Sequence, residues 1–296
     1  MEKSRKYREQ ATVLANTRIG TGIFDLRLQT DQIAKAAAPG QFVSVYSSDK
    51  SRLLPRPISI CGADKESGRL RLVFRVAGKG TEEFSRLLPG QKVDLTGPLG
   101  NGFPLDRASG AGADADGKSS ETGKRVFLIG GGIGIPPMVQ LAKALKASCG
   151  GAEAGKYEAA GGDATVKAAP QVTSVLGFRD ELFLVDDLKP YSDVVIATED
   201  GSCGTKGNVL DAIREHDLKA DVFYACGPTP MLRALKKYAE ENGIECWLSL
   251  EEKMACGIGA CLSCVCKSVE VDGHSKVKNK RVCTEGPIFR STEVEL

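Results

Sequence analysis

The cysteines of this chain are concentrated near its C-terminal end, and this limits what that part of the chain can form. Of the 10 cysteines, 5 lie between residues 256 and 283. Disulfide frameworks of such density belong to small domains in oxidising compartments, whereas this chain has 296 residues. A crowded group of cysteines in a chain of this size indicates a metal or cluster site instead.

The spacing within this group is specific. In MACGIGACLSC, four and then two residues separate three cysteines, which is how plant-type ferredoxins hold a 2Fe–2S cluster. Gly257 and Gly259 let the backbone fold closely around inorganic sulfides, where its N–H groups can donate. A fourth ligand then comes from a separate segment. We therefore predict four cluster ligands: Cys256, Cys261, Cys264 and Cys283.

A tetrahedral zinc site is the alternative, although such sites usually show pairs of C-x2-C. Cys266 stands outside the ligand pattern, two residues after Cys264. In an extended segment its side chain points to the opposite face from that of Cys264. We predict that Cys266 is a buried structural thiol.

The N-terminal part, as far as Gly100, consists of short apolar alternations separated by turns. This pattern predicts an antiparallel barrel or sandwich, with strands in 41–46, 56–60, 70–76 and 92–100 and turns at Pro39-Gly40, Ser67-Gly68 and Pro89-Gly90. One helix is expected near Thr81–Leu88, where a possible capping threonine precedes two acidic residues.

From Arg125 onward, fully apolar strands alternate with segments of helical periodicity, which predicts a parallel sheet. The alternation is expected to end near Trp247. Two segments rich in glycine, alanine and small polar residues cannot bury enough apolar surface to become ordered, and we predict flexible insertions there. The predicted regions are a barrel at 1–106, a linker at 107–123, an α/β domain at 124–247 with an insertion at 148–170, and a cysteine-rich domain at 248–296.

The motif RPISI on a barrel strand is accompanied by VFR on the next strand and by GKGT at a helix start. Backbone amides at a glycine-rich helix start form a site for a pyrophosphate, and Arg56 supplies the countercharge. The ordered set resembles the flavin domain of the ferredoxin–NADP reductase superfamily. The resemblance assigns FAD binding to Arg56, Pro57, Ile58, Ser59, Val73, Phe74, Arg75, Gly80 and Thr81.

The motif GGGIGIPPM follows a strand and opens a helix, and CGPTPM follows the last core strand. The first is not the usual Rossmann fingerprint, because prolines stand where the third glycine is expected. In the reductase superfamily it places a pyrophosphate at the helix start, and the second motif approaches the nicotinamide. The residues implied for NAD are Gly130, Gly131, Gly132, Gly134, Cys226, Gly227 and Pro228; the alternative is a tight turn with a buried thiol.

The local residues leave the choice between NAD and NADP open. Arg179 would attract the 2′-phosphate of NADP, whereas the adjacent Asp180 and Glu181 would repel it. The family resemblance favours NAD.

Nicotinamide exchanges electrons in pairs, whereas an iron–sulfur cluster exchanges them one at a time, and a flavin can do both. The sequence therefore predicts a protein that converts between two-electron and one-electron transfer. His216 and His274, its two histidines, are expected to be exposed, and no acid–base or nucleophile constellation is evident. Substrate oxidation is therefore expected on another polypeptide.

The full set of motifs, including GPLGNGF, EDGSCGTKG and RVCTEGPIF, resembles the electron-transfer subunits of bacterial type B dihydroorotate dehydrogenase. The resemblance implies a separate FMN-bearing catalytic subunit, a heterotetramer with two of each subunit, and electron flow through the cluster and FAD to NAD⁺ in pyrimidine synthesis. The alternatives are a subunit of a ferredoxin:NAD(P)⁺ oxidoreductase or sulfhydrogenase, or a zinc-bound interaction module on an inactive reductase fold.

The composition gives no reason to expect a nucleic-acid or membrane partner, since the net charge is only +2. No run of about 18 apolar residues is present, and the first residues lack the apolar core of a signal peptide. We therefore expect a cytoplasmic location.

Overall fold

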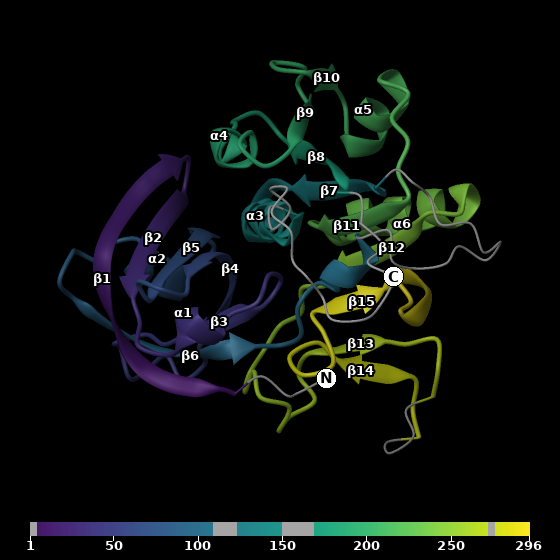
Figure 1. Ribbon diagram of the computed structural model, residues 1–296. Coiled ribbons are helices and arrows are strands. Elements are labelled where there is room, and N and C mark those ends of the chain that lie inside the picture. The colour runs from purple at the N-terminus through teal and green to yellow at the C-terminus, as the bar shows by residue number, and fades with distance from the viewer. Residues whose placement is uncertain (1–4, 109–122, 150–168, 272–275) are drawn as a thin grey trace, which may run out of the picture.

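The computed structural model describes residues 5–108, 123–149, 169–271 and 276–296. The expected insertions fall largely outside these residues, and His274 falls outside them entirely. Figure 1 shows a barrel beside a sheet covered by helices, with a small hairpin from the C-terminal region next to the sheet. The predicted multidomain fold, with an N-terminal barrel, a central α/β domain and a C-terminal cysteine-rich region, is confirmed.

Six antiparallel strands within the described residues close into a barrel in the order β1-β2-β5-β4-β3-β6. The strands are β1 (Tyr7–Gly20), β2 (Ile23–Gln29), β3 (Phe42–Val45), β4 (Arg56–Asp64), β5 (Arg69–Arg75) and β6 (Lys92–Leu99). Their inward positions carry apolar side chains such as Leu26, Leu72 and Leu95, which are fully buried. The glycines of the three predicted turns, Gly40, Gly68 and Gly90, all have positive φ.

The helices of the barrel region differ from the expectation. Helix α2 (Lys79–Phe84) begins two residues before Thr81, because the Thr81 hydroxyl accepts hydrogen bonds from the N–H groups of Ala77 and Gly78 instead of standing at the helix start. Helix α1 (Ile33–Ala36) was not expected. The Glu9 carboxylate on β1 accepts the N–H groups of residues 31–33, so a distant side chain caps this helix.

A seven-stranded sheet forms the α/β domain in the order β10-β9-β8-β7-β11-β12-β15, counting described residues only. Its strands are β7 (Arg125–Gly131), β8 (Gln171–Phe178), β9 (Asp193–Thr198), β10 (Thr205–Lys206), β11 (Val222–Cys226), β12 (Glu245–Ser249) and β15 (Ile288–Arg290). Its helices are α3 (Pro136–Cys149), α4 (Val185–Leu188), α5 (Val209–Glu215) and α6 (Thr229–Asn242), with 3-10 turns at Leu105–Arg107, Gly132–Gly134 and Ser291–Glu293.

The strands from β10 to β12 are parallel, as predicted. The chain runs outward from β7 through β8 and β9, then returns to place β11 on the other side of β7. The point between β7 and β11 is therefore a topological switch point, where α/β sheets bind ligands at the carboxyl ends of their strands.

The cysteine-rich region shares this sheet. Its hairpin, β13 (Val265–Lys267) and β14 (Asn279–Arg281), stands apart, but β15 pairs antiparallel with β12. The sheet thus continues past Trp247, where the alternation was expected to end. A strand added after so long a separation leaves no periodic signal in the sequence.

Candidate functional site

The four predicted ligand cysteines meet in two pairs. The Cys256 Sγ accepts hydrogen bonds from the backbone N–H groups of Ile258 (3.5 Å) and Cys261 (3.4 Å), and it interacts with the Cys261 thiol. The thiol of Cys283 is hydrogen-bonded to that of Cys264, and both side chains are buried. No group of three or more His, Cys, Asp or Glu side chains in the described ranges is placed to hold a single metal ion.

The electrostatics of the two pairs differ. Burial opposes ionisation of Cys256, but the N–H donors of Ile258 and Cys261 outweigh it and lower the pKa of its thiol to about 6. Burial, together with the neighbouring Cys264, raises the pKa of Cys283 to about 12.

The surroundings of the cysteines fit an iron–sulfur cluster. Gly257 and Gly259 both have positive φ, and a methyl group at Gly259 would lie 2.7 Å from the Thr284 Cγ2. The Thr284 hydroxyl is buried with no hydrogen-bond partner among the described residues. Four thiols can supply the four thiolate ligands of a 2Fe–2S cluster, and the N–H groups directed at sulfur and the unused hydroxyl can hydrogen-bond its sulfurs.

Cys266 lies on β13, outside this set. Its side chain is buried, its Sγ is 3.5 Å from the Lys280 carbonyl, and burial raises its pKa to about 11. The prediction of a buried thiol is confirmed.

The cysteine loop packs directly against the barrel. A methyl group at Gly257 would lie 2.9 Å from the Ser44 Oγ on β3 and 3.5 Å from Leu99 on β6. Just past β6, the Asn101 side chain bonds the backbone of Glu285 and Ile288. The segment carrying the cysteines is therefore held in a fixed place beside the predicted flavin domain.

On the barrel, Arg56 lies against the start of α2. A methyl group at Gly80 would be 2.9 Å from the Arg56 Nε, so the guanidinium packs closely against the helix start in this structure. The Thr81 hydroxyl, in contrast, is engaged with the backbone of Ala77 and Gly78. The structure thus places two of the predicted FAD residues, Arg56 and Gly80, side by side at the start of α2.

The other predicted FAD residues divide between the faces of their strands. Ile58 and Phe74 belong to the apolar interior of the barrel, where their side chains are buried. Pro57 and Ser59 are half-buried, and Val73 packs in the apolar cluster that includes helix α3.

The two predicted nicotinamide motifs lie side by side at the switch point. Gly130 is paired with Cys226 in the β7–β11 register. A methyl group at Gly134 would overlap the Cys226 carbonyl, and one at Gly131 would lie 2.6 Å from the Met231 Sδ. The glycines are therefore required for the close approach of the two loops. Burial raises the pKa of Cys226 to about 12, so its thiol stays neutral.

The barrel and the switch point face each other. The Arg75 guanidinium on β5 lies 3.9 Å from the position of a methyl group at Gly132, whose φ is +52°. Both residues line a cavity of about 540 Å³ that also contains Arg179, Asp180 and Glu181. The Glu181 carboxylate accepts the Thr21 N–H at 2.7 Å, so Glu181 helps to fasten the barrel to the α/β domain.

Three family models match this arrangement. An oxidoreductase FAD-binding domain matches residues 9–103, and an oxidoreductase NAD-binding domain matches 128–237. The iron–sulfur cluster binding domain of dihydroorotate dehydrogenase B matches 251–295, which favours the cluster over the zinc alternative.

The curated relatives cover nearly the whole chain. The electron transfer subunit of dihydroorotate dehydrogenase B (NAD(+)) from a Geobacillus species is 41% identical over 291 residues, which are 97% of this chain and 98% of the relative. The chain belongs to this family. A member of the family from Listeria monocytogenes is 40% identical, with 96% of this chain and 97% of the relative covered.

Solved structures extend the likeness beyond the dihydroorotate dehydrogenase B family. A structure of an NADH-dependent reduced ferredoxin-NADP oxidoreductase matches 96% of this chain and 89% of its own, with a TM-score of 0.74 and 28% identity. An Amycolatopsis cytochrome P450 reductase, at 20% identity and a TM-score of 0.60, shares the fold. The predicted cofactors, FAD, NAD and an iron–sulfur cluster, match the three domain families found.

Two features went unnoticed in the sequence. Asn101 stands in the quoted motif GPLGNGF, but its bonding to Ile288 depends on the path of the chain. Thr284 follows directly after Cys283, and that adjacency was the available signal.

His216, at the C-terminal end of α5, is exposed as expected. Among the described residues, no helix is long and apolar enough to cross a membrane.

Proposed function

We propose that this chain is the electron-transfer subunit of an NAD-linked dihydroorotate dehydrogenase. In this function, electrons taken from dihydroorotate by a catalytic partner leave as NADH, and the path runs through this chain. The observation that carries the proposal is the packing of the cysteine loop on barrel strands β3 and β6, while Arg75 of β5 faces the nicotinamide motifs. FAD, when bound, exchanges electrons both in pairs and singly, which the two ends of the path require.

We assign the binding of the FAD pyrophosphate to Arg56 and the start of α2 at Gly80. The guanidinium and the backbone N–H groups together provide a positive site, and Arg56 is held beside Gly80 before the ligand arrives. Ser59 faces outward and can hydrogen-bond the flavin edge. Ile58 and Phe74 lie in the barrel interior, so we limit their part in FAD binding to their backbone.

We assign NAD binding to the two motifs at the switch point. Gly130 to Gly134 turn the chain into α3 and offer backbone N–H groups to the pyrophosphate. The adjacent turn at Cys226, Gly227 and Pro228 lies beside the position that we assign to the nicotinamide ring. The buried Cys226 thiol keeps its proton, so this side chain adds no negative charge to the site.

We assign the cluster to the four paired cysteines. The N–H groups of Ile258 and Cys261 hydrogen-bond the Cys256 sulfur and keep it in the thiolate form, which metal binding requires. Gly257 and Gly259 take the positive φ values of the loop without strain.

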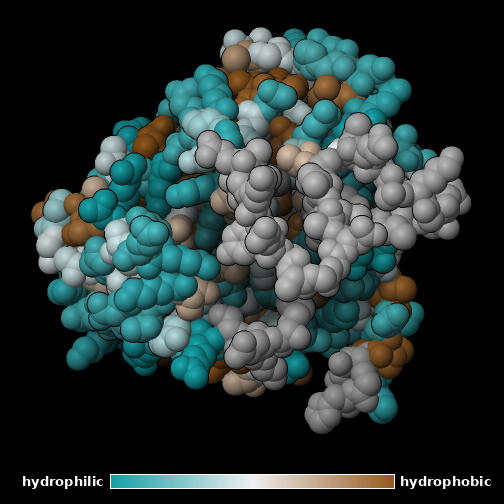
Figure 2. Space-filling model, in the orientation of Figure 1, coloured by the Kyte–Doolittle hydropathy of each residue, from teal (hydrophilic) through white to brown (hydrophobic). Residues whose placement is uncertain are grey.

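The cysteine loop is also the proposed contact with the catalytic partner. Ile258 is 50% exposed and Leu262 is 70% exposed, although both are apolar. A further set of exposed valines, Val269, Val271 and Val277, lies around the β13–β14 hairpin, where Figure 2 shows apolar side chains at the surface. We propose that the partner carries FMN and that two copies of each subunit form a heterotetramer. The cytoplasmic location stays a prediction.

The decisive experiment is co-expression with the candidate FMN subunit. We expect a stable complex that reduces NAD⁺ when dihydroorotate is added. A complex that forms NADH from reduced ferredoxin, and none from dihydroorotate, would establish the alternative function instead.

A further inference from the structure

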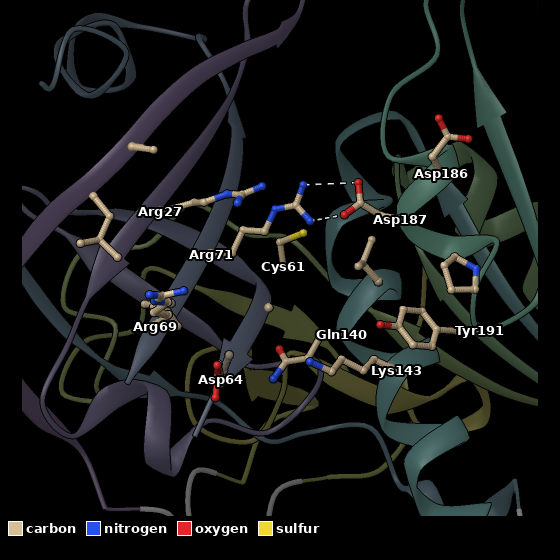
Figure 3. Close-up of a pocket in the computed structure, with 17 residues that line it drawn as sticks. Arg27, Cys61, Asp64, Arg69, Arg71, Gln140, Lys143, Asp186, Asp187 and Tyr191 are labelled. Carbon is tan, nitrogen blue, oxygen red and sulfur yellow. Dashed lines mark hydrogen bonds and ion pairs between the residues drawn. The ribbon is translucent and has the colours of Figure 1, made fainter. Parts of the chain in front are cut away.

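A second cavity lies between the barrel and the α/β domain, away from the proposed cofactor sites. It has a volume of about 730 Å³ and is bounded by β1, β4 and β5 on one side and by α3 and α4 on the other. Figure 3 shows side chains from both domains converging on it. None of the residues assigned above to FAD, NAD or the cluster lines this cavity.

An ion pair crosses one edge of the cavity. Arg71 on β5 is bonded to Asp187 of α4, and it also contacts Asp25 at 3.0 Å. The charge of Arg71 is thus satisfied within the protein, and the pair links the two domains (Figure 3). Burial beside this pair raises the pKa of Cys61 to about 12, so its thiol is neutral.

A buried acceptor on α3 remains unused. Gln140 is only 8% exposed and lines the cavity, and its Oε1 has no hydrogen-bond partner among the described residues. In Figure 3 its amide extends from α3 toward the barrel. A buried carbonyl oxygen without a donor is costly, so a ligand that fills this position must bring an N–H or O–H group.

Two cations on the rim are not engaged in close ion pairs with described residues. Arg69 of β5 and Lys143 of α3 form no ion pair with any described residue, although both line the cavity. Of the acids nearby, Asp186 pairs with Lys189 at 2.7 Å, whereas Asp64 accepts the Ser67 hydroxyl at 2.6 Å and keeps its negative charge, which Lys143 attracts. Four cations (Arg27, Arg69, Arg71 and Lys143) and three acids (Asp64, Asp186 and Asp187) line the cavity, so its lining has a small positive net charge.

We propose that this cavity binds a small heterocycle that carries one anionic group and a ring N–H donor. The ring N–H donates to the Gln140 Oε1, and the anionic group lies between Arg69 and Lys143. Tyr191 and Val139 provide apolar walls for the ring. Nucleoside monophosphates and pyrimidine carboxylates share this chemistry. Because the ligand contacts both domains, its binding strengthens their contact at the edge opposite the nicotinamide site.

The test is isothermal titration calorimetry of the full chain loaded with FAD and cluster, in saturating NAD⁺ to occupy the nicotinamide site. The probes are uridine 5′-monophosphate, orotate, inorganic phosphate and 3-methyluridine 5′-monophosphate. We expect one heterocycle to bind at a single site, and the one that binds identifies the anionic group as phosphate or carboxylate. For the nucleotide, loss of the imide N–H by methylation should weaken binding about tenfold, and inorganic phosphate should bind more weakly still.

Variants locate the binding. Gln140→Met removes the acceptor at nearly constant volume, so it should weaken binding of the heterocycle about tenfold and abolish the difference in affinity made by methylation. Arg69→Ala and Lys143→Ala should each weaken binding of every anion, whereas Lys219→Ala, at an exposed position, should leave the affinities unchanged. Melting temperatures of the variants show that they are folded. The proposal is overturned if neither heterocycle binds, if Gln140→Met leaves affinity unchanged, or if Lys219→Ala weakens binding as much as Lys143→Ala.

Discussion

The side chain of Asn101 holds the backbone of Ile288 at both of its polar groups. The Asn101 Oδ1 accepts the Ile288 N–H at 2.9 Å, and its Nδ2 donates to the Ile288 carbonyl at 2.8 Å and to that of Glu285 at 3.1 Å. Asn101 follows the last barrel strand, and Ile288 begins the strand that joins the cysteine-rich region to the sheet. Asn101 therefore helps to hold the cysteine-rich region against the proposed flavin domain.

Replacement of this clamp should destabilise the protein. We expect Asn101→Ala to lower the free energy of unfolding by about 1–3 kcal/mol, because half-buried backbone groups lose their partners. Urea unfolding followed by circular dichroism measures this change. Asn242→Ala, which loses one exposed bond to Tyr238, is the control, and an equal effect of the two changes would contradict the role given to Asn101.

Loss of a cluster ligand should interrupt electron transfer between dihydroorotate and FAD but not between NADH and FAD. We expect Cys261→Ala to abolish dihydroorotate-dependent NAD⁺ reduction while NADH still reduces FAD at close to the normal rate. Stopped-flow absorbance on the FAD-loaded variant measures the second reaction. Cys266→Ala removes a buried thiol outside the ligand set and should keep the cluster absorbance. Loss of FAD reduction in folded Cys261→Ala would show that the cluster does not simply lie beyond FAD.

The exposed apolar side chains of the cysteine loop should govern assembly. We expect Leu262→Asp to weaken binding to the catalytic subunit at least about tenfold, since a charge would have to be buried in the contact. Size-exclusion chromatography of the co-expressed subunits measures assembly, and the visible spectrum confirms that the cluster is retained. Leu88→Asp changes a leucine that is 62% exposed on the barrel and should assemble normally. Assembly of both variants would place the interface elsewhere.

The close packing of the nicotinamide motifs should not tolerate a methyl group. In Gly134→Ala the new Cβ meets the Cys226 carbonyl, so the two loops must separate. A displacement of about 1 Å can cost roughly 100-fold in rate, and we expect a fall of that order in FAD reduction by NADH, with FAD still bound. Gly62→Ala, whose Cβ would be 3.6 Å from Arg71, should react normally. Unchanged kinetics in Gly134→Ala would remove these motifs from the nicotinamide site.

Several features were predictable because their signal is local. The spacing of Cys256, Cys261 and Cys264 encodes one tight loop, and the glycines before α3 encode a tight turn between strand and helix. Alternating apolar and polar residues predicted the barrel strands, whereas continuous apolar runs separated by helical segments predicted the parallel sheet. These patterns work over a few residues, where spacing alone decides which side chains can converge.

Other features were decided only by the tertiary structure. Helix α1 is capped by Glu9 from a different element, and β15 joins a sheet whose preceding strand ends at Ser249. Ile58 was assigned to the flavin site, yet its side chain fills the barrel, because closure of the sheet determines which face is inside. The sequence by itself determined the modules and their cofactor chemistry. The chain path determined how the cysteine loop, barrel and switch point meet, since contacts between distant residues depend on packing that leaves no periodic pattern.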